Sequence, residues 1–216
     1  MDRALTLHGF FRSSAAWRVR IGLELKGVAY AQVARHLRRG EQSSPDYLAL
    51  NRQGLVPALE VGGEGALAQS LAIVEWIDET QPGPKLLPAD PRGRARVRAM
   101  AQIIACDVHP IQNLRVLLYL KRELGQEQAT IDAWARHWIM LGLDAFEARL
   151  AEPESARFCH GDAPGLADLC LVPQLGNARR FGLDLAAYPR ILAIEAACNT
   201  LPAFQRSAPE AQPDAE

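Results

Sequence analysis

One stretch decides how this sequence folds: FRSSAAWRVR, residues 11–20. It follows an alternating run over residues 4–8 that predicts a strand, and it opens an apolar pattern that predicts a helix over 14–26. Ser13 and Ser14 therefore stand where a helix begins, among free backbone N–H groups and the positive end of the helix dipole. Such a point binds an anion, and a serine there also serves as a plain helix N-cap. The decapeptide alone leaves both interpretations open.

The residues after this helix extend the pattern into a small α/β layer. Gly27 ends the helix, and residues 29–34 predict a second strand, so the strand-helix-strand unit implies parallel pairing with a right-handed crossover. A helical turn is expected over 44–50, and a strand follows that is entered through Pro57. After a glycine turn and a brief strand, another helix begins at Ser70. The order β-α-β-α-β-β-α fits one compact layer.

Proline-rich sequence over 81–91 separates this layer from a helical second part. We therefore expect two domains, residues 1–84 and residues 91–216. Apolar residues between Val97 and Leu118 trace one helix face, which Pro110 should kink.

Further helices complete the expected second domain. One helix follows the apolar face from Ile131 to Ala145, and the next begins after Gly165, with Asp168 at its third position. Shorter helices are predicted over 188–198 and 202–206. The Pro- and Ala-rich tail from Ser207 is expected to be loosely held.

The composition limits the functions this chain can have. A formal net charge of -1 gives no basic footprint for nucleic acid or a membrane surface, and Arg92, Arg94, Arg96 and Arg98 predict only a solvated helix start. No apolar run reaches the roughly 20 residues of a membrane span, so we expect a cytoplasmic protein. The four cysteines have no metal-like spacing to the histidines, which predicts mostly buried free thiols and no metal site.

The chain resembles the cytosolic glutathione S-transferases, and more narrowly their zeta class. The Val-Pro and Gln-Ser pairs are shared by all such transferases, whereas the segments Arg12 to Arg20 (RSSAAWRVR), His109 to Leu114 (HPIQNL) and Asn177 to Phe181 (NARRF) are similar to those of the zeta class, and all stand in the order that this class has them. The resemblance covers nearly the whole chain. It implies a thioredoxin-like α/β domain that binds glutathione, followed by an all-helical domain that supplies much of the second-substrate site.

The resemblance also implies roles for single residues. Ser13 and Ser14 would face the glutathione sulfur, with Ser13 the favoured partner, and Val56 before a cis-Pro57 would pair with the cysteinyl part. Other positions would bind glutathione or substrate, and these are Gln69, Ser70, His109 and Gln112. Arg12 and Arg180 would bind the carboxylates of the substrate. Ala15 stands where many zeta enzymes have Cys, which puts any side activity that needs this thiol in doubt.

The implied activity is glutathione-dependent cis–trans isomerisation of maleylacetoacetate, a small dianionic substrate, to fumarylacetoacetate. The alternative substrate is maleylpyruvate. Two further interpretations stay open: a general glutathione transferase, and a non-catalytic protein that binds glutathione or a partner on the same fold. The family usually forms a homodimer, which the sequence neither shows nor excludes.

Overall fold

A computed structural model describes residues 4–216. The chain forms two compact units, one that runs to Leu86 and includes Asn199–Glu216, and one that consists of Leu87–Cys198. The division into domains at residues 84 and 91 stays a prediction. The return of the last residues to the first unit was not expected from the sequence.

The first unit is built on a four-stranded sheet of order β2-β1-β3-β4. Its strands are β1 (Leu5–Gly9), β2 (Ala31–Ala34), β3 (Ala58–Val61) and β4 (Gly65–Ala68). Strands β1 and β2 are parallel, as the strand-helix-strand pattern predicts, and the other two pairs are antiparallel. The predicted α/β order and the thioredoxin-like fold class are confirmed.

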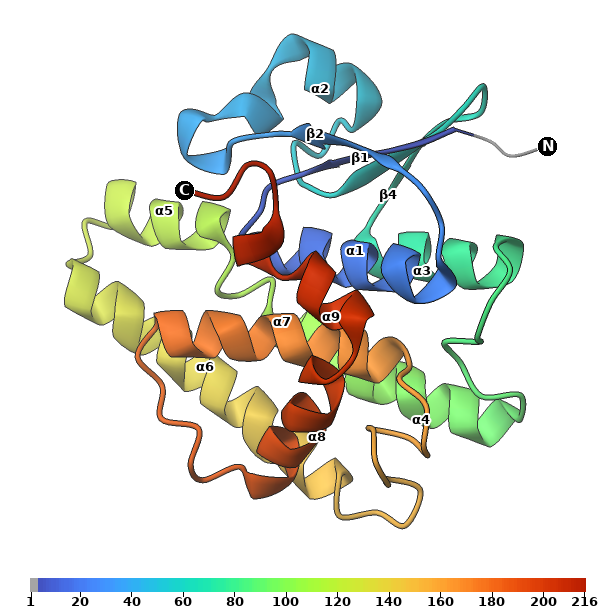
Figure 1. The fold of residues 1–216 in the computed structure, drawn as a ribbon. Coiled ribbons are helices and arrows are strands. Elements are labelled where there is room, and N and C mark those ends of the chain that lie inside the picture. Colours follow the sequence, from blue (N-terminus) through green and yellow to red (C-terminus); the bar gives the residue numbers. More distant parts are fainter. Residues whose placement is uncertain (1–3) are drawn as a thin grey trace. The chain divides into compact units, whose positions relative to one another are not determined.

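Helices cover both faces of this sheet. Helices α1 (Ser14–Lys26) and α3 (Ser70–Thr80) pack side by side on one face, and α2 (Pro45–Leu50) lies on the other (Figure 1). Helix α9 (Pro202–Ser207) packs against α1. Gly27 ends α1 in the left-handed conformation, as predicted. The core contains fully buried apolar side chains from the sheet and from both long helices: Leu7, Val19, Leu23, Leu59, Ile73 and Ile77.

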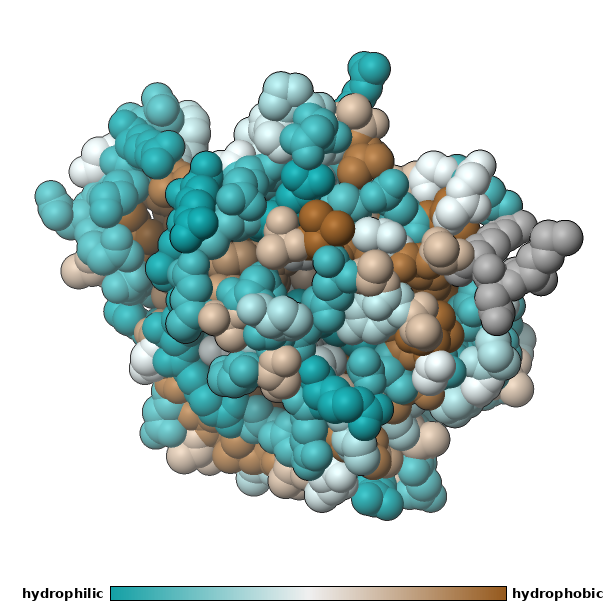
Figure 2. Space-filling view, turned by 45° about the horizontal axis from the view of Figure 1, so that its top comes forward, coloured by the Kyte–Doolittle hydropathy of each residue, from teal (hydrophilic) through white to brown (hydrophobic). Residues whose placement is uncertain are grey.

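The second unit is helical. Its elements are α4 (Pro91–Gln102), a π-helical turn (Ile103–Val108), α5 (Leu114–Arg122), α6 (Gln128–Arg149), α7 (Leu166–Arg180) and α8 (Pro189–Asn199), whose last residue belongs to the first unit. None of the helices among residues 4–216 is long and apolar enough to cross a membrane. On the face drawn in Figure 2, hydrophilic residues predominate and hydrophobic ones lie between them in small groups.

The expected single kinked helix between Val97 and Leu118 is wrong. Helix α4 ends at Gln102, and the π-helical turn follows before the chain leaves helical geometry. Pro110 has no N–H to continue the ladder, and the side chain of Asn113 caps a new helix by accepting the N–H of Arg115. The segment therefore forms two separate helices with a turn between them, and not one helix with a kink.

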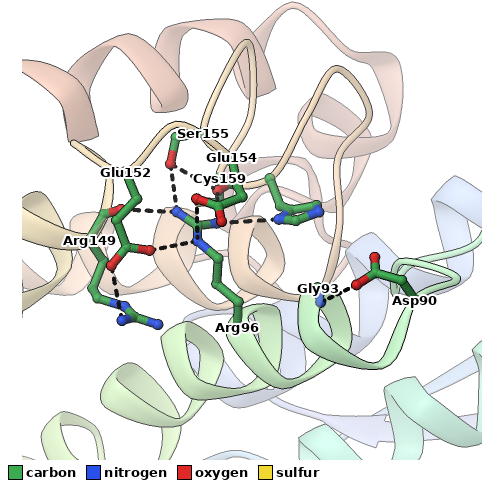
Figure 3. Close-up of polar contacts among 9 residues, drawn as sticks. Asp90, Gly93, Arg96, Arg149, Glu152, Glu154, Ser155 and Cys159 are labelled. Carbon is green, nitrogen blue, oxygen red and sulfur yellow. Dashed lines mark hydrogen bonds and ion pairs between the residues drawn. The ribbon is translucent and has the colours of Figure 1, made fainter.

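Arg96 also departs from the prediction, because it is buried and not part of a solvated helix start. Its guanidinium donates to the Glu152 carboxylate at 2.8 Å, to the backbone carbonyls of Cys159 and Arg149 at 2.8 and 2.9 Å, and to the Ser155 hydroxyl at 2.8 Å (Figure 3). These bonds fasten the loop between α6 and α7 onto α4. In that loop, Gly165 begins α7 as predicted, and its N–H donates to Asp168 at 2.8 Å.

Candidate active site

The register of the sheet gathers three chain segments at one edge. His8 near the end of β1 pairs with Ala58 at the start of β3, and Ala58 pairs with Ala68 at the end of β4. The loop that enters α1, the Val56-Pro57 pair and the Gln69-Ser70 pair therefore lie next to one another. We call this the site edge, and it consists of residues 10–14, 56–57 and 69–70.

Two helices begin at the site edge. Ser13 is the N-cap of α1, and its Oγ accepts the N–H of Ala16 at 3.2 Å. A hydroxyl has one donor besides its two acceptor sites, so this cap leaves the O–H of Ser13 able to donate to another group. Ser14 is buried in the first turn. The cap and an anion contact are therefore compatible in one serine, which the sequence alone did not show.

Arg12 gives the site edge a positive charge. Its guanidinium lies over the rings of Phe10 and Phe11, at 5.9 and 5.3 Å from their centroids. Burial first, and then the positive charge of Arg38, lower the pKa of Arg12. Within residues 4–216 the Nε of Arg12 is buried and has no hydrogen-bond partner. A cation in such surroundings is stabilised by a bound anion.

The start of α3 supplies the second helix terminus. Ser70 is buried in the first turn and accepts a hydrogen bond from Nη1 of Arg18 at 3.3 Å, which links α3 to α1. Gln69 has a φ of 70°, a left-handed conformation that is rare for a residue with a side chain. Its Nε2 donates to Gln53 Oε1 at 2.8 Å. The dipole and the free N–H groups of α3 favour a carboxylate at this point.

The Val56-Pro57 peptide bond is cis. The residue before it is held in place, because the carbonyl of Leu55 accepts hydrogen bonds from Tyr47 Oη at 2.6 Å and Asn51 Nδ2 at 2.8 Å. These two bonds restrain the backbone immediately before Val56, which lies next to the end of β1.

In the second unit, the structure joins Gln112 to Arg180 through Asn177. Arg180 donates to Asn177 Oδ1, Asn177 Nδ2 donates to Gln112 Oε1, and Gln112 Nε2 donates to Gln174 Oε1 at 3.3 Å. A guanidinium can only donate, so Arg180 fixes the orientation of each amide in the series. Gln112 and Gln174 are buried, whereas Arg180 is exposed.

The other predicted residue of this unit, His109, is half-buried after the π-helical turn, and its backbone N–H donates to the carbonyl of Ile104 at 2.8 Å. Within residues 4–216, no group of three or more His, Cys, Asp or Glu side chains is arranged to hold a metal ion.

Sequence reasoning missed three residues that support the predicted site residues, namely Gln174, Asn177 and Arg18. Gln174 and Asn177 lie three residues apart on α7, and Arg180 follows Asn177 by three more, so the two missed residues of α7 share one helix face with Arg180. A glutamine inside the apolar run of α7 was the available signal. Arg18 was a similar signal, since it is a charged residue that points into the buried side of α1.

Comparisons with known proteins show the family of this chain. The family model "Glutathione S-transferase, N-terminal domain" matches residues 12–80. A maleylpyruvate isomerase of Ralstonia sp. is 52% identical over 211 residues, which are 97% of this chain and 99% of the relative. The first unit therefore has the fold of the N-terminal domain of glutathione S-transferases.

Two similar solved structures indicate which class of glutathione transferase the chain belongs to. One is the holo structure of a maleylpyruvate isomerase, a bacterial glutathione S-transferase in the zeta class, with a TM-score of 0.95 and 51% identity over 98% of this chain and 100% of that chain. The other is a maleylacetoacetate isomerase of Methylobacterium extorquens AM1 with bound malonate and glutathione, with a TM-score of 0.95 and 44% identity over 98% and 99%. The chain belongs to the zeta class of the glutathione transferase family.

Proposed function

We propose that this protein is a glutathione-dependent cis–trans isomerase that converts maleylacetoacetate to fumarylacetoacetate. The observation that supports this most is the site edge, where two helix N-termini and the Arg12 guanidinium meet a serine hydroxyl that is free to donate. An isomerase of this class has to hold a thiolate and a carboxylate at one place, and these groups suit both.

The residues of the site edge fit glutathione. Within residues 4–216 the buried Nε of Arg12 has no hydrogen-bond partner, and burial is the first cause that lowers the pKa of this arginine, so a bound anion would stabilise its charge. Ser70 and Gln69 at the start of α3 would hold the γ-glutamyl carboxylate, and the backbone of Val56 would pair with the cysteinyl part. Ser13 would face the sulfur, with Ser14 beside it.

When bound, glutathione supplies a thiolate that adds to the cis double bond and leaves again after rotation about the resulting single bond. The contribution of Ser13 is to donate its O–H to the sulfur and so favour the anion. A free cysteine thiol has a pKa of about 8.5, and lowering it by about two units corresponds to roughly 2.7 kcal/mol. The N-terminus of α1 acts in the same direction.

Arginine side chains would hold the dianionic substrate. Each guanidinium can bind a carboxylate with two parallel hydrogen bonds, so Arg12 and Arg180 suit a substrate with one carboxylate at each end. Gln112, and His109 near it, would contact glutathione or the substrate. These arginines would also place positive charge near the keto oxygen of the substrate and so favour negative charge at that atom.

Maleylpyruvate is the second candidate substrate, and the 52% identity to the Ralstonia maleylpyruvate isomerase supports it. Both substrates share the maleyl group and the two carboxylates, so the groups described above serve either one. The two differ in the length of the tail beyond the keto group. A homodimer, expected from the resemblance, and a cytoplasmic location, expected because no apolar run reaches the length of a membrane span, belong to the same proposal. They are checked by light scattering and cell fractionation.

The test is a side-by-side assay of the purified protein with maleylacetoacetate and maleylpyruvate, with and without glutathione, while total thiol is followed. We expect glutathione-dependent isomerisation at constant thiol, and the larger kcat/KM identifies the substrate. Net loss of thiol would instead indicate a conjugating transferase. Glutathione binding without turnover of either compound would indicate a non-catalytic binding protein.

A further inference from the structure

The C-terminal segment, residues 207–216, is anchored at the site edge, although its composition predicted a loosely held tail. Ser207 and Gln212 are buried. Gln212 Nε2 donates to the carbonyls of Arg206 and Ala208 at 2.8 Å, which folds the segment back on the end of α9. Gln212 Oε1 accepts from Gln32 Nε2 at 3.2 Å, which ties the segment to strand β2.

Asp214 reaches the loop that carries the site residues. Its Oδ2 accepts the backbone N–H of Phe11 at 2.9 Å, across 203 residues of sequence. Phe11 immediately precedes Arg12 and Ser13. A hydrogen bond from a backbone N–H to an ionised carboxylate is stronger than one between neutral groups, so this contact restrains the loop more than an ordinary turn bond does.

Arg20 holds the other side of the same residue. Its Nη2 donates to the carbonyl of Phe11 at 2.8 Å, and its Nε donates to the carbonyl of Ser207 at 3.0 Å. The side chain is 2% exposed, and burial lowers the pKa of Arg20 to about 10, against the opposite effects of Tyr30 and Asp214. Phe11 is thus fixed at its N–H by the tail and at its carbonyl by an arginine that also binds the tail.

Two more features lie near the hydrogen bonds that hold Phe11. Glu216 pairs with His36 Nε2 at 2.8 Å, and the His36 ring packs on the Phe10 ring at 5.0 Å between centroids. Pro213 and Asp214 also close a cavity of about 100 Å³ against Phe10 and the ends of β1 and β2. The tail therefore contacts the loop directly at Phe11 and reaches Phe10 through His36, on the residues that lead into Arg12.

We propose that Asp214 is a positioning residue for the site edge: by holding Phe11, it sets where the Arg12 guanidinium and the Ser13 hydroxyl lie. The last residues of the chain thereby set the affinity of the site edge for an anion. This inference rests on the proposed function in one respect, which is that glutathione is the ligand of the site edge.

The test compares three variants of the full-length protein. Asp214→Ala removes the acceptor, Asp214→Asn keeps a neutral acceptor oxygen, and Glu210→Ala is the matched control, because this tail carboxylate has no hydrogen bond or ion pair within the described part of the chain. We expect Asp214→Ala to weaken glutathione binding by about tenfold in calorimetry, as loss of one charge-assisted hydrogen bond would. The KM for glutathione should rise similarly, and Asp214→Asn should recover part of the loss.

A second measurement needs no ligand. Hydrogen–deuterium exchange over residues 9–16 should be faster in Asp214→Ala and unchanged in Glu210→Ala. If the wild-type protein binds glutathione without isomerising, the proposed function fails while binding and exchange still test Asp214. Binding by folded Asp214→Ala within twofold of wild type would overturn the inference, as would an equal loss in Glu210→Ala.

Discussion

Replacing Asn177 with alanine removes the side chain that joins Gln112 to Arg180. The buried Oε1 of Gln112 then loses its donor, which should lower the free energy of unfolding by about 1–3 kcal/mol. Arg180 is exposed, so its own hydrogen bond adds little stability, and its loss acts on orientation instead. The guanidinium keeps its contact with the Phe181 ring, at 5.1 Å from the centroid, but it loses one of the bonds that orient it, and this order has to be restored when a substrate binds.

The cost of that reordering sets the expected kinetic effect. A hydrogen bond to a charged group contributes about 1.5–3 kcal/mol when it is shielded from water, and less on an exposed side chain. We therefore expect kcat/KM for the dianionic substrate to fall about tenfold, which is roughly 1.4 kcal/mol of transition-state binding. For a neutral electrophile, which has no carboxylate for Arg180, the change should stay within about twofold.

The assay is steady-state isomerisation at saturating glutathione, run beside urea unfolding of the same samples. Asn177→Asp is the informative second variant, because it keeps an acceptor for Arg180 but adds a negative charge that competes with the substrate carboxylate. It should raise KM for the dianion more than Asn177→Ala does. If kcat/KM of Asn177→Ala stays at the wild-type value while unfolding free energy falls, the amide series supports only the fold, and the reasoning is refuted.

Three further variants test other parts of the argument. Arg180→Ala should raise KM for the dianion far more than for a neutral electrophile, and equal effects on both would contradict the carboxylate contact. Ser13→Ala should move the pH–rate profile to higher pH, because the sulfur loses a donor that favours its anion, and an unmoved profile would remove Ser13 from the reaction. Arg96→Met leaves the carbonyls of Cys159 and Arg149 without their donor and should lower the unfolding free energy by about 2–4 kcal/mol in urea titration. An unchanged midpoint would contradict the inference that Arg96 fastens the loop between α6 and α7 onto α4.

Local signals predicted those parts of the fold that depend on neighbouring residues. The helix from Ser14 to Lys26 was predicted with its observed bounds, because a capping serine stands before it and Gly27 stands after it. The start of α7 was predicted at Gly165 for the same reason, since Asp168 accepts the N–H of Gly165 three residues away. Such contacts lie within one turn of helix, so the sequence pattern contains both partners.

Contacts between distant residues could not be predicted in this way. The burial of Arg96 depends on acceptors that lie 53 to 63 residues away, and an arginine-rich run looks the same whether or not they are present. The tail shows the same limit, because proline and alanine give no sign of a carboxylate that meets Phe11 across 203 residues. The break at Pro110 was misread because the apolar spacing continues past it although the helix does not.

The position of the site follows from the packing of the core. Leu7 of β1 pairs with Leu59 of β3, and both side chains are fully buried on the face that α1 and α3 cover. A slip of one residue in this pair would turn Leu59 to the opposite face of the sheet. The slip is unfavourable because the apolar area that Leu59 buries would be lost. The same register puts the end of β1 beside the start of β3, and thus Ser13 near Val56. The apolar residues that need burial therefore also decide which polar groups meet at the site edge.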